Sequence, residues 1–595
     1  MFTENNAELN LSEIIQKVDL MEQAKNDLPP LKIAFLHNIM IDPIVPYLKF
    51  LCFEEGFYPN IYLGDYDNVM QSILDVESSF YRHQADIVVL CVKLENLSEK
   101  LFQSFTSLSV SEVQEESDRI LGYFEQAIGE IRKHSKATIL VHNFEILAYP
   151  SFGVLDYQCS SKQINTIRQI NLKLVDLINK YENAFIVDLD LLQSNVGYHN
   201  FIDRRYWQIG KLPYTRQATE VLAKEYMKFI RARMGKNRKC LVLDCDNTLW
   251  GGILGEDGIG GIKIGKTYPG IAYFEFQQAI LSLYHRGILL AICSKNNEAD
   301  VLEVFRDHPE MVLRENHFAI LKINWKDKVA NLKEIADELN IGLDSFVFMD
   351  DSEFEANMVK NCLPQVKTVS LPNDPTLYRD ILNSLGFFDS LAFSEEDKVR
   401  SAMYQAEAQR KKVKTQFEDL DEYYRYLEIE VDICSADEFS VGRIAQLTQR
   451  TNQFNLTTKR YTETDIKSFN HSPEHAVLYL KYKDRFGDAG IVGVVILAYT
   501  AEYALIDTFL LSCRVIGRGI EDVLLKACLE RAKKANKQTI CGLYLKGKKN
   551  GQVADFYRKR GFTLDSQDEN EAKFGFSLEK PIFCVPAYFK AIRTQ

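Results

Sequence analysis

An Asp-x-Asp-x-Thr pattern, formed by Asp244, Asp246 and Thr248, directly follows the short apolar run LVL at 241–243. An aspartate at the end of a buried strand can attack a phosphorus atom and form an aspartyl-phosphate. A second carboxylate two residues on can protonate the leaving oxygen and later deprotonate the hydrolytic water. Because a phosphate would be repelled by two acids, a divalent cation is needed, and oxygen ligands favour Mg2+. The pattern predicts Asp244 as nucleophile and Asp246 as its acid/base partner.

Three further elements supply the remaining parts of such a site in chain order. The apolar run GILLAICS ends at Ser294, whose hydroxyl can donate a hydrogen bond to a phosphate oxygen. Lys328 begins a helical pattern and can neutralise phosphate charge; Lys326 competes for this role, but Lys328 heads the helix. The run SFVFMDD ends in Asp350 and Asp351, two further carboxylates for the cation. The predicted metal ligands are Asp244, Asp246, Asp350 and Asp351.

Each of these elements has a simpler explanation when taken alone. A single Asp-x-Asp-x-Thr can be a turn with capping acids, and Ser294 can be a helix cap. All four elements in order, each after an apolar run, resemble the four motifs of the haloacid dehalogenase (HAD) superfamily. Only 45 residues separate Thr248 from Ser294, and 33 separate Ser294 from Lys328, which leaves no room for a large cap domain. An uncapped site is open to water and to large partners.

A second signature, Arg514-x-x-Gly517-x-Gly519, lies where an apolar run turns into a helical pattern. Glycines let backbone amides approach a pyrophosphate, and a helix N-terminus favours its negative charge. Together with Asn550 and Tyr557 in NGQVADFYRKRGF, this turn resembles the coenzyme A site of the GCN-five-related N-acetyltransferases (GNAT). The resemblance implies that Arg514, Gly517, Gly519 and Asn550 bind coenzyme A or a phosphopantetheine arm, and that Tyr557 protonates the departing thiolate. The alternative is a GNAT-like fold without this function, because a fold does not fix a function.

The elements that must position these residues fall into three segments. Apolar runs rich in Val and Ile alternate with helical patterns over 1–232 and again over 237–390, which predicts two doubly wound parallel-sheet domains. A long polar helix is expected at 394–427. Antiparallel-looking strands follow it, so 394–595 is expected to hold this bridging helix and an α+β domain. The predicted fold class is therefore α/β multidomain.

The first segment resembles the SGNH hydrolases in its order of strands, but it lacks their catalytic residues. The turn LHNIMIDP after the first apolar run contains no Ser. Asp203 has no His three residues on, and His199 lies four residues before it. We expect this domain to be degenerate, with Asn143 in a vestigial pocket and a scaffold or carrier-docking role.

Composition excludes several classes of function. The 595-residue chain has a net charge of −12, which argues against non-specific nucleic-acid binding. No stretch approaches the ~20 apolar residues of a membrane span, and the N-terminus has no export signal. The twelve cysteines lack CxxC pairs, so reduced thiols in the cytoplasm are expected. Cys245 and Cys513 are candidates for an acyl thioester, with a small buried hydrophobe as the alternative for each.

The combination of DCDNTLWGGILGEDG, TNQFNLTT and SCRVIGRG resembles the FkbH-type proteins, of HAD subfamily IIIC, over nearly the whole chain. The resemblance implies a glyceryl transferase/phosphatase. Such a protein takes the acyl phosphate 1,3-bisphosphoglycerate, removes phosphate, and loads glyceryl onto the phosphopantetheine thiol of an acyl carrier protein for polyketide or related pathways. Two alternatives stay open: a stand-alone phosphomonoesterase with inert flanking domains, and an N-acyltransferase for a sugar or amine in surface polysaccharide synthesis.

Overall fold

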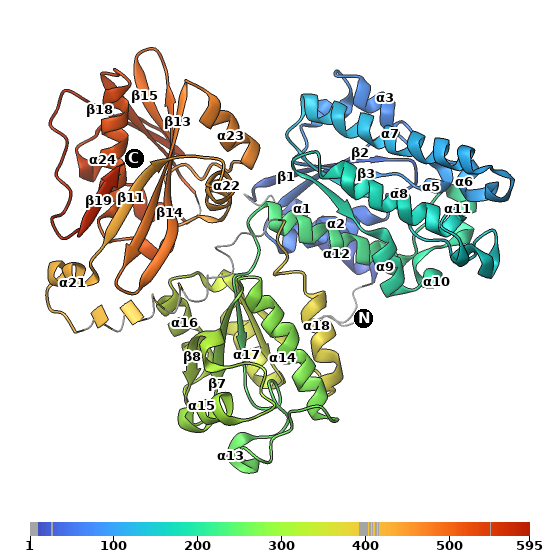
Figure 1. Cartoon of the computed structure of the whole chain (residues 1–595), viewed down its shortest axis with the longest axis horizontal. Coiled ribbons are helices and arrows are strands. Elements are labelled where there is room, and N and C mark those ends of the chain that lie inside the picture. Colours follow the sequence, from blue (N-terminus) through green and yellow to red (C-terminus); the bar gives the residue numbers. More distant parts are fainter. Residues whose placement is uncertain are drawn as a thin grey trace. The chain divides into compact units, whose positions relative to one another are not determined.

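The computed structural model describes residues 10–24, 28–391, 403, 406, 409–410, 413–414, 416–547 and 549–594. The chain divides into two compact units, one over Asn6–Arg233 and one that includes Met234–Gln595, and each is considered by itself (Figure 1). Helices accompany three separate sheets, so the predicted multidomain α/β fold class is confirmed. None of the described helices combines the length and the apolar character that a membrane span requires.

The unit Asn6–Arg233 is built on a five-stranded, all-parallel sheet in the order β2-β1-β3-β4-β5. Every residue of β3 and β4 is buried, as expected for central parallel strands with both faces covered. The strands are β1 (Pro30–His37), β2 (Tyr58–Leu63), β3 (Ile87–Cys91), β4 (Thr138–His142) and β5 (Ala184–Val187). The helices are α1 (Leu11–Gln23), α2 (Ile44–Glu54), α3 (Val69–Leu74), α4 (Ser79–His83), α5 (Leu94–Leu97), α6 (Glu99–Gln103), α7 (Val110–His134), α8 (Gln163–Ile178), α9 (Leu189–Val196), α10 (Tyr198–Phe201), α11 (Arg204–Gly210) and α12 (Arg216–Arg233).

A second five-stranded parallel sheet, in the order β10-β9-β6-β7-β8, follows. The chain moves outward from β6 through β7 to β8 and then crosses to β9, so β6 lies at the switch point where such folds bind ligands. The strands are β6 (Cys240–Leu243), β7 (Leu289–Ser294), β8 (Phe318–Ile323), β9 (Phe346–Asp350) and β10 (Lys367–Ser370). The helices are α13 (Leu254–Asp257), α14 (Gly270–His285), α15 (Glu298–Asp307), α16 (Lys328–Leu339), α17 (Glu353–Cys362) and α18 (Tyr378–Ser384).

Short connections leave the carboxyl edge of this sheet without a cap domain. Over the fully described range 240–370, only α13 and α14 lie between β6 and β7, and only α15 and a 3-10 turn (Glu315–His317) lie between β7 and β8. Apolar side chains pack on both faces of the sheet and form one core around Leu243 and Phe276 and another around Val242 and Leu332. The sheet is therefore a rigid support for the residues at its carboxyl edge.

The C-terminal part holds a mixed sheet in the order β17-β18-β16-β15-β14-β13-β11-β19, with β12 paired to β15 off this path. About half of the helix predicted at 394–427 lies outside the described residues, and the described residues 416–419 form a turn that separates α21 from the part before it. The strands are β11 (Glu430–Ser435), β12 (Phe454–Asn455), β13 (His475–Asp484), β14 (Gly487–Tyr499), β15 (Tyr503–Leu511), β16 (Thr539–Leu545), β17 (Thr563–Gln567), β18 (Glu571–Ser577) and β19 (Ala591–Thr594). The helices are α21 (Leu420–Leu427), α22 (Val441–Arg450), α23 (Glu463–His471) and α24 (Ile520–Lys534).

Candidate phosphoryl-transfer site

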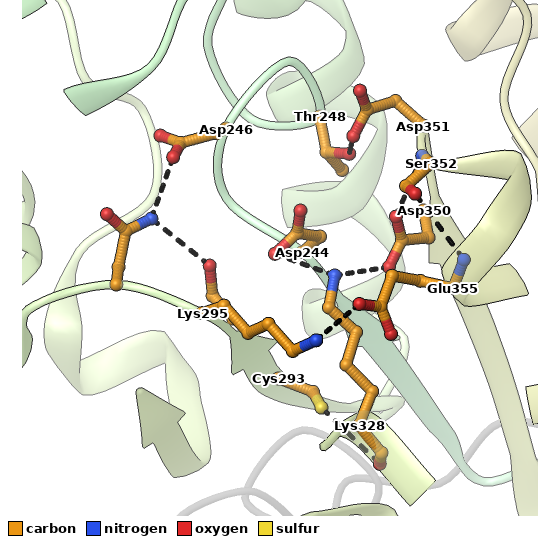
Figure 2. Close-up of polar contacts among 12 residues, drawn as sticks. Asp244, Asp246, Thr248, Cys293, Lys295, Lys328, Asp350, Asp351, Ser352 and Glu355 are labelled. Carbon is orange, nitrogen blue, oxygen red and sulfur yellow. Dashed lines mark hydrogen bonds and ion pairs between the residues drawn. The ribbon is translucent and has the colours of Figure 1, made fainter. Parts of the chain in front are cut away.

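Three carboxylates meet at the carboxyl ends of β6 and β9 (Figure 2). Asp244 follows β6, Asp350 is the last residue of β9, and Asp351 comes next. One side-chain oxygen of each lies within 4.8 Å of the others. Thr248 supports the cluster, because its Oγ1 donates a hydrogen bond to Asp351 Oδ1 at 3.4 Å. A compact set of carboxylate oxygens is the donor set that hard divalent cations prefer.

Lys328 provides the positive charge inside this cluster. Its Nζ lies 3.2 Å from Asp244 Oδ1 and 2.5 Å from Asp350 Oδ2. Asp327 caps α16 by accepting a hydrogen bond from the Ala330 amide, and this cap fixes Lys328 as the first helical residue. Lys326, the competing lysine, has a 60% exposed side chain and pairs with Glu334 instead. The structure thus brings Lys328, and not Lys326, to the carboxylates.

The electrostatics of the cluster favour an added cation. With all three carboxylates ionised and one ammonium present, the net charge is −2. Burial and the negative charge of Asp244 raise the pKa of Asp350 to about 7 and that of Asp351 to about 6. Although burial opposes it, the charges of Asp244 and Asp350 raise the pKa of Lys328. Asp244 Oδ1 is buried, and its contact with Lys328 Nζ at 3.2 Å is an ion pair without hydrogen-bond geometry. These carboxylates therefore fit a divalent cation such as Mg2+.

Asp246 does not join the cluster, which corrects the expectation that its side chain is a fourth metal ligand. Its Oδ1 accepts hydrogen bonds from Trp250 Nε1 at 2.9 Å and from the Leu254 amide at 3.0 Å. Its Oδ2 accepts one from Asn296 Nδ2 at 2.9 Å. In Figure 2 the Asp246 carboxylate lies apart from Asp244. The described side-chain set for a cation is therefore Asp244, Asp350 and Asp351.

Ser294 ends β7 with 1% of its surface exposed, and its Oγ accepts a hydrogen bond from Asn296 Nδ2 at 3.3 Å. Asn296 and Trp250 were not predicted from the sequence. The one feature that could have pointed to them is that they lie close in sequence to Ser294 and Asp246. Lys295 and Glu355 were also missed. They form an ion pair of 2.5 Å beside the cluster, with Glu355 Oε2 buried and unpartnered. These four residues extend the polar site beyond the motif positions.

Cys245, one of the two candidate thioester residues, gains no support from its surroundings. Cys245 is fully buried in the core beneath the site, and burial raises the pKa of its thiol well above the ordinary value. A thiol of this kind stays protonated and is a poor nucleophile. The expected alternative, a small buried hydrophobe, fits Cys245. The side chain of Cys513 lies outside the described part of the structure.

The gap between β15 and β16 is filled by the chain itself. The two strands pair in parallel only from Tyr503–Ile506 with Thr539–Gly542 and then separate. Into the gap comes β12, paired with the end of β15. The Leu456 amide donates to Phe509 O at 3.0 Å, and Leu456 O accepts from the Leu545 amide at 2.8 Å. The Phe509 carbonyl of β15 and the Leu545 amide of β16 are thus bonded within the chain.

Asn550 and Tyr557 are also committed to the protein interior. Asn550 is fully buried; its Nδ2 donates to Asn455 O and Leu545 O, and its Oδ1 accepts from the Gly547 amide. Tyr557 is 1% exposed, its hydroxyl has no partner, and burial raises its pKa well above the ordinary value. This placement contradicts the expected role of Tyr557 as an acid for a thiolate and that of Asn550 as a cofactor ligand.

The Arg514-x-x-Gly517-x-Gly519 turn is covered in part. Tyr424 donates to Gly517 O at 2.6 Å, and Tyr588 donates to Arg518 O at 3.0 Å. A Cβ added to Gly519 would lie 2.3 Å from the Tyr588 hydroxyl, so that ring occupies the space beside Gly519. Arg514 is 7% exposed and donates to Ser512 Oγ at 3.1 Å. Gly517, in contrast, is exposed, and a Cβ added there would meet no atom within 4 Å.

In the N-terminal unit, the remnants of an SGNH-type site have structural partners. Asn143 donates to Asp188 at 2.8 Å and accepts from the Leu189 amide at 2.7 Å. Asp203 caps α11 by accepting a hydrogen bond from the Tyr206 amide. These bonds assign Asn143 and Asp203 to loop and helix architecture.

The fold and the site define a multidomain protein with a HAD-like phosphatase domain, and the comparisons agree. Residues 32–231 match the family described as FkbH, N-terminal domain. The solved N-terminal part of the protein BF1531 from Bacteroides fragilis, described as containing a phosphatase domain complexed with Mg, is 28% identical to this chain. That match covers 65% of this chain and 100% of the other, with a TM-score of 0.59. The chain is thus similar to FkbH-type proteins over residues 32–231 and to the BF1531 fragment over 65% of its length.

Other solved structures match about a quarter of the chain. The ribosomal-protein-S18-alanine N-acetyltransferase from Escherichia coli matches with 13% identity and a TM-score of 0.21, covering 25% of this chain and 94% of its own. The GNAT domain of S. lividans PAT matches with 14% identity and a TM-score of 0.21, covering 24% of this chain and 89% of its own. No curated protein matches the chain.

Proposed function

We propose that this chain is a Mg2+-dependent phosphatase and glyceryl transferase that uses an acyl phosphate such as 1,3-bisphosphoglycerate and delivers glyceryl to an acyl carrier protein. The observation that carries the proposal is the cluster of Asp244, Asp350 and Asp351 around Lys328 at the carboxyl edge of a parallel sheet. The BF1531 fragment, complexed with Mg, supports Mg2+ as the cation. Held by these carboxylates, Mg2+ would neutralise phosphate charge.

The proposed phosphatase reaction has two steps. Asp244 attacks phosphorus, the bond from phosphorus to the leaving oxygen breaks, and Asp246 gives that oxygen a proton. Ser294 donates a hydrogen bond to a phosphate oxygen, and Lys328 offsets the charge. A water molecule then attacks the aspartyl-phosphate, Asp246 takes its proton, and inorganic phosphate leaves with Asp244 restored as a carboxylate.

The chemistry of 1,3-bisphosphoglycerate dictates which phosphate this site removes. Hydrolysis of the acyl phosphate would yield a free carboxylate that no longer acylates a thiol. We therefore assign the phosphomonoester group at the far carbon to the HAD-like site. The carrier thiolate attacks the acyl carbon, the carbon–oxygen bond to the other phosphate breaks, and that phosphate leaves. Because Cys245 is buried, the proposal uses the carrier thiol directly.

A stand-alone phosphomonoesterase is the second candidate, and the burial of Asn550 and Tyr557 favours it over an N-acyltransferase. The full chain, 1,3-bisphosphoglycerate and a holo carrier protein should give a carrier with glyceryl mass by intact mass spectrometry. Asp244→Asn should abolish the release of the far phosphate. Phosphate release without any carrier adduct would leave only the phosphomonoesterase. Release that is unchanged in Asp244→Asn would refute both candidates.

A further inference from the structure

The carboxylate of Asp246 is held on both oxygens by N–H donors of the chain. Trp250 Nε1 and the Leu254 amide donate to Oδ1 at 2.9 and 3.0 Å, and Asn296 Nδ2 donates to Oδ2 at 2.9 Å. Trp250 is fully buried and Asn296 is 6% exposed, so water cannot readily replace either donor. Hydrogen bonds from N–H groups to a carboxylate are about twice as strong as those between neutral groups.

Packing fixes the Trp250 donor in place. The residue forms a backbone bridge with Asp246, and its ring packs edge-on against Phe305 of α15 at 6.1 Å between ring centres. Gln277 of α14 donates to Leu249 O at 2.7 Å, which anchors the neighbouring backbone. These contacts hold the Trp250 ring with its indole N–H pointing toward Asp246.

Asn296 links the two sides of the site. Its Nδ2 reaches Asp246 Oδ2 at 2.9 Å and Ser294 Oγ at 3.3 Å. The distance between the acid/base group and the hydroxyl that faces phosphate is thereby set by one buried amide. Loss of this amide would free one oxygen of Asp246 and the Ser294 hydroxyl together.

We infer that Trp250 and Asn296 are positioning residues that keep Asp246 out of the carboxylate cluster and available for proton transfer. The inference rests on the proposed function, in which Asp246 serves the leaving oxygen and then the hydrolytic water. Without these donors, the Asp246 carboxylate would be attracted to a cation held by Asp244 and could rotate toward it as a further ligand. The three N–H donors oppose that rotation.

The two reaction steps depend on Asp246 to different degrees, and this gives a specific expectation. The leaving carboxylate of an acyl phosphate needs no proton, so the attack of Asp244 on acetyl phosphate should be nearly unaffected by loss of a donor. Attack on an alkyl phosphate needs a proton at the leaving oxygen and should slow. Hydrolysis of the aspartyl-phosphate needs the base and should slow with every substrate.

The test compares Trp250→Phe and Asn296→Ala with Glu303→Gln in the full chain with Mg2+. Glu303→Gln changes an exposed side chain of α15 and serves as the control. Rapid quenching with acetyl phosphate and with glycerol phosphate measures the formation and decay of the phosphoenzyme. We expect about tenfold slower decay in the first two variants, from the loss of one charged hydrogen bond, so that phosphoenzyme accumulates from acetyl phosphate. In Glu303→Gln the rates of formation and decay should match those of the wild type.

The outcomes separate this inference from the proposed function. If the wild type forms no phosphoenzyme that depends on Asp244, the proposed function fails. If it does form one, and Asn296→Ala and a folded Trp250→Phe decay at the wild-type rate, only the positioning role is refuted. Equal slowing of both steps with both substrates would also overturn it, because a general structural defect does not depend on the leaving group. Asn296→Ala keeps the test decisive if Trp250→Phe does not fold.

Discussion

Replacing Asp351 by asparagine should stabilise the metal-free protein and remove most of its stabilisation by Mg2+. Asp351 lies in the carboxylate cluster, and Thr248 at 3.4 Å is its one side-chain hydrogen-bond donor among the described residues. Burial and the charge of Asp244 raise its pKa to about 6 from the ordinary 3.8. The ionised form is therefore disfavoured in the folded chain, and Asp351→Asn removes that repulsion while keeping the side-chain shape.

The size of the stability difference follows from the raised pKa of Asp351. Two pKa units correspond to about 3 kcal/mol, and because part of the carboxylate faces water we expect about 1–2 kcal/mol at pH 7.5 without metal. Since the folded-state pKa is raised, the stabilising protonated form is fully present below pH 4. Its contribution is lost as the pH rises through about 6. The advantage of Asp351→Asn over the wild type should therefore appear near neutral pH and vanish in acid.

Magnesium should reverse the order of the two proteins. A cation present at 100 times its dissociation constant stabilises the wild type by about 2.7 kcal/mol, or ~5–10 °C for a domain of this size. Calorimetry of the full chain in EDTA and in Mg2+ measures both effects, following the transition that Mg2+ moves. Glu303→Gln, an exposed change on α15, is the matched control. If Asp351→Asn is less stable than the wild type in EDTA and gains as much from Mg2+, the cluster is not the cation site.

Three further predictions test neighbouring parts of the argument. Lys328→Met should abolish phosphate release and lower the free energy of unfolding by about 3–5 kcal/mol, because it leaves buried carboxylates unpaired. Lys326→Met should retain phosphate release, and equal activity of the two variants in a phosphate assay would contradict the role of Lys328. Asn550→Ala should destabilise the C-terminal sheet by about 2–4 kcal/mol, because buried backbone groups lose their partner, and urea unfolding measures the change; phosphate release should not change. Because Asn550 and Tyr557 are buried, acetyl-CoA should show no binding by calorimetry, and micromolar affinity would contradict this reading of the two residues.

The sequence predicted the sheets and the strand-end residues well for a physical reason. Buried parallel strands are short apolar runs, and their carboxyl ends meet at one edge, so Asp244, Ser294 and Asp350 could be placed together from chain order alone. Lys328 followed from the helix signal, because an acid before a helical pattern caps it and fixes the next residue. The fold class and this arrangement required only local patterns.

The direction of side chains could not be predicted in the same way. A spacing of two residues places Asp246 near Asp244, but its orientation depends on Trp250 and Asn296, which act through the tertiary structure. The strand β12 is two residues long and has no periodicity, so its insertion beside β15 had no local signal. Asn550 was expected to bind a cofactor because of its place in a motif, whereas one of its partners, Asn455 O, lies 95 residues away in sequence. These errors arose because hydrogen bonds and burial in the folded chain, and not the motif spacing, decide what each side chain contacts.

The far phosphate could be removed before or after glyceryl is transferred to the carrier thiol, and the open edge of the sheet favours one of these two orders. If the far phosphate is removed before transfer, Asp244→Asn should give no adduct that carries free glyceryl and no phosphorylated adduct. If the carrier thiol attacks first, Asp244→Asn should accumulate a phosphoglyceryl carrier, which the wild type would then dephosphorylate. The second order requires a site that admits a substrate tethered to a protein. The short connections over 240–370 allow this, since no cap domain closes the carboxyl edge of the sheet there. We therefore expect the phosphoglyceryl carrier in Asp244→Asn, and its absence beside normal loading by the wild type would place phosphate removal first.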